Sequence, residues 1–171
     1  MNLDKFFEEE GSESNVARGL ISGFLGGLAG TAVKAAAERF LEVRWVNEKK
    51  VQRQVIEQFS DRLTGSGVSD RQDQVMDQLV KIPLGASVGA AYGYGKRDHQ
   101  DINLMDGAML GVTTWLSTHD TTLPILGVQK TDQDIPLKVQ ANELLSHLLY
   151  GLTTEAVRSV VNKGLQNIQE D

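Results

Sequence analysis

The sequence predicts an all-α fold, a helical bundle of about four glycine-zipped helices plus one or two charged amphipathic helices. Small residues recur at four-residue spacing in four separate stretches, and no stretch alternates in the way typical of a β-strand. Residues four apart in a helix share a face, so a row of glycines leaves a groove in which another backbone can lie closely. We therefore expect helices closer together than the usual distance of about 8 to 10 Å.

Bulk composition is that of an acidic protein of one domain. The 171 residues are 40% hydrophobic and 23% charged, with a net charge of -6 and a mean hydropathy of -0.25. These values are close to those of average soluble proteins. The absence of cysteine excludes disulfides and thiolate chemistry. An acidic balance without a basic stripe also argues against nucleic acid as a partner.

The first close-packing helix is predicted over Gly19 to Glu38, with Ser14 or Asn15 as its N-cap. It follows residues 1–15, which are polar and acidic and are expected to form a mobile tail or a short surface helix around Phe6 and Phe7. A run without charge extends from Gly19 to Val33 and ends at Lys34, whose long side chain can extend a short membrane span. Its glycines form two interleaved rows, Gly19, Gly23, Gly27 and Gly26, Gly30.

A charged amphipathic segment, residues 38–82, is inserted between the first and second close-packing helices of one domain that covers residues 16–171. Apolar residues repeat every four positions at Val51, Val55, Phe59 and Leu63, which predicts a helix lying against another surface. A capping-box pattern then predicts a new helix start near Asp70.

Three further close-packing helices follow in the sequence. The second comes after Pro83, the third precedes the polar residues 117–120, and the fourth runs from about residue 139 to 165. Polar connectors at 96–103 and 129–138 separate them. Their packing glycines are Gly85, Gly89 and Gly93, then Gly107 and Gly111, and finally Gly151.

Two stretches of the sequence resemble a known family. They are the first helix, GLISGFLGGLAGTAVKAAAERF, and the run that joins TLPILGV at 122–128 to ELLSHLLYGLTTEAVR at 143–158. Both are similar to the YagU-like family, small bacterial inner-membrane proteins of uncharacterised function. The resemblance implies a multi-pass protein of the bacterial inner (cytoplasmic) membrane, without an established catalytic activity. Where the family has two prolines and an arginine after its first helix, this chain has Glu42, Val43 and Arg44, which predicts continuous helix there.

Ionisable residues lie on or near the small-residue faces, and we interpret them as a candidate buried charge network. In a membrane such groups must find partners, and they commonly mark proton or ion paths. The alternative is local pairing, Lys34 with Glu38 and Glu155 with Arg158, worth a few tenths of a kcal/mol in each case. The candidate residues are Lys34, Glu38, His119, Asp120, Glu143, His147 and Glu155.

Catalysis and metal binding are not predicted. Glu143 and His147 are four residues apart and could form a metal site with His119 and Asp120, but the paired ligand motifs of zinc and di-iron sites are missing. No nucleophile motif such as G-x-S-x-G occurs. The sequence therefore predicts no enzymatic activity, no cofactor and no metal.

Two functional hypotheses remain open from the sequence. The first is a small multi-pass membrane protein whose partners are the lipid bilayer and further copies of the chain, bound through the small-residue faces. The second is a soluble, cytoplasmic all-α scaffold or interaction module. The negative mean hydropathy favours the second, as does the lack of an uncharged apolar run of about 18 residues.

Overall fold

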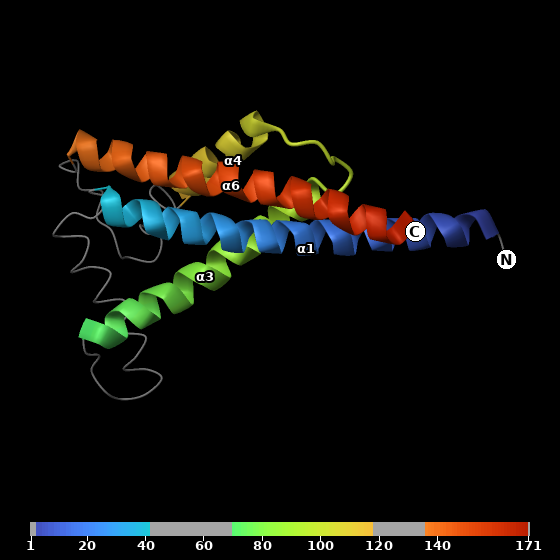
Figure 1. Ribbon diagram of the computed structural model, residues 1–171, viewed down its shortest axis with the longest axis horizontal. Helices are drawn as coiled ribbons and strands as arrows, with labels where there is room; N and C mark the ends of the chain where they lie inside the picture. Colours follow the sequence, from blue (N-terminus) through green and yellow to red (C-terminus); the bar gives the residue numbers. More distant parts are fainter. Residues whose placement is uncertain (1–2, 42–69, 118–135, 171) are drawn as a thin grey trace.

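The computed structural model describes residues 3–41, 70–117 and 136–170, and the regular secondary structure of these residues is helical, without any β-strand. The predicted all-α class is confirmed for this part of the chain. His119, Asp120 and the apolar stripe from Val51 to Leu63 lie outside the described residues. The helices are α1 (Leu3–Phe40), α3 (Asp70–Gly95), α4 (Leu104–Leu116) and α6 (Leu137–Glu170), labelled as in Figure 1.

Helix α1 begins earlier than the sequence pattern predicts. It starts at Leu3 and continues without interruption to Phe40, so the residues expected to form a separate tail are part of the same helix. Residues 3–40 contain no proline that would interrupt a helix. The predicted helix start at Ser14 or Asn15 is therefore wrong.

The four helices pack in the order α3, α1, α6, α4, and each packed pair is antiparallel. Gly19 lies against Gly93 and Gly27 against Gly85, so α3 runs opposite to α1. Helix α6 lies beside α1 over much of its length, whereas the N-terminal part of α3 diverges from α1 (Figure 1). The C-terminal ends of α1 and α4 and the N-terminal ends of α3 and α6 therefore lie together, on one side of the bundle.

The two glycine rows of α1 contact different helices. One row, Gly19, Gly23 and Gly27, lies against α3, where a Cβ added at Gly19 would be 2.7 Å from the carbonyl oxygen of Gly93. The other row lies against α6, where a Cβ added at Gly30 would be 2.7 Å from the carbonyl oxygen of Tyr150. Side chains at these positions would force the backbones apart.

Helices α4 and α6 meet in the same way. A Cβ added at Gly151 would be 2.5 Å from the amide nitrogen of Gly111, and one added at Gly111 would be 2.8 Å from the Cα of Leu148. Gly107 faces the same stretch of α6, and a Cβ added there would be 3.0 Å from the carbonyl oxygen of Gly151. Close approach of backbones is thus the packing mode of all three helix pairs.

The buried side chains of the bundle are mostly polar, and its outer surface carries many large hydrophobic side chains. Among the described side chains, the buried hydrophobic ones are Ala86, Val139 and Tyr150. The buried polar or charged ones are more numerous: Arg18, Ser22, Thr31, Ser146, His147, Thr154, Glu155, Arg158, Ser159 and Asn162. Exposed large hydrophobic residues occur on every helix, for example Leu20, Phe24, Ile82, Leu84, Met105, Met109, Leu145 and Val160. This distribution is the reverse of that in most water-soluble domains.

Candidate functional site

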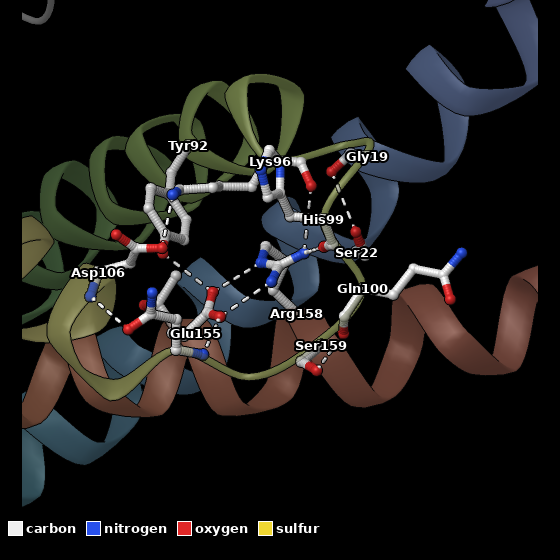
Figure 2. Close-up of polar contacts among 12 residues, drawn as sticks. Gly19, Ser22, Tyr92, Lys96, His99, Gln100, Asp106, Glu155, Arg158 and Ser159 are labelled. Carbon is white, nitrogen blue, oxygen red and sulfur yellow. Dashed lines mark hydrogen bonds and ion pairs between the residues drawn. The ribbon is translucent and has the colours of Figure 1, made fainter.

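The buried carboxylate of Glu155 is the centre of the main polar cluster (Figure 2). Its side chain is 1% exposed. Arg158, one turn further along α6, donates to it twice, from Nε at 2.7 Å and from Nη2 at 2.9 Å. The Tyr92 hydroxyl of α3 donates to Oε2 at 2.9 Å, and the backbone N–H of Asn103 donates to Oε1 at 2.9 Å. One carboxylate therefore joins α6, α3 and the start of α4.

Arg158 holds the connector between α3 and α4, residues 96–103. Its Nη1 donates to the backbone oxygen of His99 at 2.8 Å and lies 3.5 Å from that of Lys96. Ser159 adds a hydrogen bond from its hydroxyl to the backbone oxygen of Gln100 at 2.6 Å. A polar face of α6 thus binds the backbone of the connector.

The same connector sets the position of α4. Asn103 is the N-cap of α4, and its side-chain oxygen accepts from the backbone N–H of Met105 at 3.0 Å. The Lys96 ammonium lies 2.5 Å from the carboxylate of Asp106, in the first turn of α4. An N-cap of this kind stabilises a helix by about 1 kcal/mol. Contacts from the connector and from Glu155 of α6 therefore determine where α4 begins.

The burial of the Glu155–Arg158 pair makes it energetically demanding. Removing two charges from water costs several kcal/mol per ion, and their attraction offsets this only when further hydrogen bonds complete the geometry. Here Tyr92, Asn103 and the connector carbonyls supply those bonds. These hydrogen bonds help to offset the cost of removing the two charges from water. Loss of either partner would leave the other charge buried alone.

A surface pocket lies over this cluster. Its volume is about 380 Å³. It is lined by the connector residues 98–103, by Asp106 of α4 and by Arg158, which lies at its inner side. Three carboxylates line it, but the described residues contain no group of three or more side chains arranged to hold a metal ion.

A second charged cluster lies on α1 and α3. The Lys34 ammonium pairs with the Glu38 carboxylate, whose other oxygen is 3.5 Å from the ammonium of Lys81. Lys81 and Tyr92 are eleven residues apart on α3, which corresponds to about 16 Å along the helix axis. The two clusters are therefore at different levels of the bundle.

The predicted network residues are thus divided between several places. Glu155 is in the first cluster, and Lys34 and Glu38 are in the second. His147 is buried, and its Nδ1 lies 3.0 Å from the backbone oxygen of Glu143 on the same helix. Both local pairs of the alternative interpretation are present, Lys34 with Glu38 and Glu155 with Arg158.

Sequence reasoning did not identify Tyr92, Asn103 or the connector as part of the site. Tyr92 is in the glycine-rich run of α3, and the spacing of the glycines does not indicate what the residues between them contact. Asn103 had a usable signal, since it directly precedes an apolar run and Asn is a preferred N-cap.

Among the described helices, α1 alone is both long enough and apolar enough to cross a membrane. Residues Asn15–Phe40 have a length and composition that suit a membrane span or a signal sequence.

Comparison with known families gives a match over most of this fold. A family model described as "Protein of unknown function (DUF1440)" matches residues 28–156. The chain belongs to the DUF1440 family. The DUF1440 match includes Tyr92, the connector and Glu155, and it ends two residues before Arg158. Comparisons with curated proteins and with solved structures found no match.

Proposed function

We propose that this DUF1440 protein is a small multi-pass membrane protein whose helices form a bundle with a polar interior inside the bilayer. One observation carries the proposal: among the described residues the buried side chains are mostly polar, whereas large hydrophobic side chains are exposed on each of the helices α1, α3, α4 and α6. In water such a surface is costly, at about 25 cal/mol for each Å² of apolar area. In lipid the same surface is favourable, and the polar groups find their partners inside.

Helix α1 supports a membrane location by its length and exposure. The 26 residues from Asn15 to Phe40 rise by about 39 Å, enough to cross a hydrocarbon core of about 30 Å. The apolar window in this helix is 33% buried within the bundle. The core helix of a soluble protein would be buried over most of its surface, so this exposure favours lipid as its surroundings.

Helix α6 is less hydrophobic on average than α1, but several of its polar residues face inward. Ser146, Thr154 and Asn162 are fully buried, while Leu145 and Val160 are exposed. A mean taken along the sequence combines the two faces and understates the hydrophobicity of the outer one. The resemblance of this helix to the YagU-like inner-membrane family supports the same location.

Fractionation of the expressed protein tests the proposal. We expect the full chain to sediment with membranes and to remain there after a carbonate wash, which removes peripheral proteins. Release by carbonate would indicate surface attachment. Recovery in the soluble fraction would contradict the proposal and favour the soluble interaction module, for which the exposed hydrophobic residues would be a protein-binding surface.

A second candidate function is proton or ion handling by the buried charged residues. The observation in its favour is a fully buried Glu155–Arg158 pair in hydrogen-bond contact with Tyr92, since ionisable groups within membranes commonly serve such paths. In proteoliposomes, this function predicts a pH-driven flux that Glu155→Gln abolishes while the protein stays folded. Equal flux in the parent and in empty liposomes would exclude it.

A further inference from the structure

We infer that the Glu155–Arg158 cluster and its pocket open to the side of the membrane opposite the cytoplasm. The inference rests on the proposed membrane location. It adds an orientation and identifies the aqueous phase that reaches the pocket.

The helix directions divide the chain between two ends of the bundle. Because the packed helices are antiparallel, the C-terminal ends of α1 and α4 and the N-terminal ends of α3 and α6 lie at one end of the bundle, which we call the linker end. The connector 96–103 and the C-terminal end of α6 lie at the other, the pocket end (Figure 1). The pocket is lined by this connector and therefore belongs to the pocket end.

Basic residues are concentrated toward the linker end. Positive residues in short loops favour the cytoplasmic side of a membrane, and acidic residues contribute little to this bias. Of the 17 Lys and Arg residues, eleven are in the parts of the sequence on the linker side and six on the pocket side. The eleven are Lys34, Arg39, Arg44, Lys49, Lys50, Arg53, Arg62, Arg71, Lys81, Lys130 and Lys138.

Burial reduces the number of basic residues that can face water at the pocket end. Two of the six basic residues on the pocket side, Arg18 and Arg158, are buried. Ion pairs occur at both ends, Lys163 with Asp101 at the pocket end and Lys34 and Lys81 with Glu38 at the linker end, so pairing does not change the comparison. The pocket end therefore has fewer basic residues than the linker end, and by this bias the linker end is the cytoplasmic one.

Single cysteines can report this orientation because the native chain contains none. Asp101→Cys places a thiol at the pocket, where the native side chain is 97% exposed. Leu137→Cys places one at the linker end, at a residue that is 80% exposed. Phe24→Cys, on the apolar surface of α1, is the control within the proposed lipid-facing region. Each variant is treated with a membrane-impermeant maleimide in spheroplasts and in inside-out vesicles.

The expected result is that Asp101→Cys is labelled in spheroplasts, Leu137→Cys in inside-out vesicles, and Phe24→Cys only after solubilisation in detergent. The reverse pattern for the first two variants, with Phe24→Cys still protected, would overturn the orientation and leave the membrane location intact. Labelling of all three variants in the soluble fraction of lysed cells would instead contradict the membrane location itself.

Discussion

At the scale of single residues, two ion pairs that look alike in the sequence have different surroundings. Lys34–Glu38 and Glu155–Arg158 are both local helix pairs, but the side chains of the first are 20% and 13% exposed and those of the second 1% each. Water can screen the first pair, whereas the second depends on Tyr92, Asn103 and the connector for its hydrogen bonds. The same local pattern therefore has different energetic weight at the two positions.

Arg158→Met is expected to lower the free energy of unfolding by about 3 to 5 kcal/mol, because it leaves the Glu155 carboxylate buried without its counter-charge. Lys34→Met is the matched control, with an expected loss of about 0.5 kcal/mol or less. Denaturant titration of both variants in mild detergent measures the difference. Equal losses would mean that burial does not distinguish the two pairs.

Asn103→Ala is expected to cost about 1 kcal/mol, because the first amide groups of α4 lose the side-chain oxygen that accepts their hydrogen bonds. Asn103→Asp keeps an accepting oxygen and should retain most of the stability. Hydrogen exchange of α4 amides measures the effect, which should be concentrated in the first turn. Exchange that is unchanged in Asn103→Ala would contradict the role of this cap.

At the scale of helices, a glycine can stabilise or destabilise the fold, depending on whether a second helix packs against it. Gly89 lies against the backbone of α1, where an added Cβ would be 2.5 Å from the Cα of Gly27. Gly164, in α6, has open space within 4 Å of the same added atom. Glycine weakens a helix in both cases. At Gly89 the close approach of α1 compensates for this loss of helix propensity, whereas at Gly164 no neighbouring group does so.

Gly89→Ala is therefore expected to destabilise the fold by about 1 to 3 kcal/mol through overpacking, whereas Gly164→Ala should be neutral or stabilising by up to about 1 kcal/mol through helix propensity. Midpoints of thermal unfolding in detergent give the sign of each change. A stabilised Gly89→Ala variant would show that α1 and α3 can separate without cost.

Self-association through the glycine faces stays a prediction. In the structure the glycine rows of α1, together with Gly107 and Gly111 of α4, face helices of the same chain. Copies that used these faces would have to compete with the contacts inside each chain. Association between intact bundles would therefore involve the outer surfaces of the helices.

At the scale of the whole molecule, the outer surface determines which solvent suits the bundle. Phe24 is 45% exposed midway along the apolar part of α1, whereas Phe40 is 87% exposed at its end. In a bilayer the two positions would lie at different depths. A lysine at the end of a span can reach the interface, whereas a lysine at its centre cannot do so easily. In water both positions would simply be surface positions.

Phe24→Lys is expected to reduce the membrane-integrated fraction, since a central lysine costs about 2.5 to 3.5 kcal/mol on insertion scales. Phe40→Lys is the control and should leave the fraction nearly unchanged. Quantitative blotting of carbonate-washed membranes measures both. If neither variant alters the distribution, or if Phe24→Lys only improves solubility, lipid does not cover this face of α1.

The sequence by itself determined the helical class and the two glycine rows of α1, because both follow from spacing along one helix. It also suggested Glu155 and Arg158 as a local pair. Only the tertiary structure decided that this pair is buried and bound to Tyr92 and to a connector more than fifty residues away, and that Lys34 lies with Lys81 in another cluster. The physical reason is that periodicity reports which side chains share a face, whereas the neighbour of that face depends on how distant helices pack.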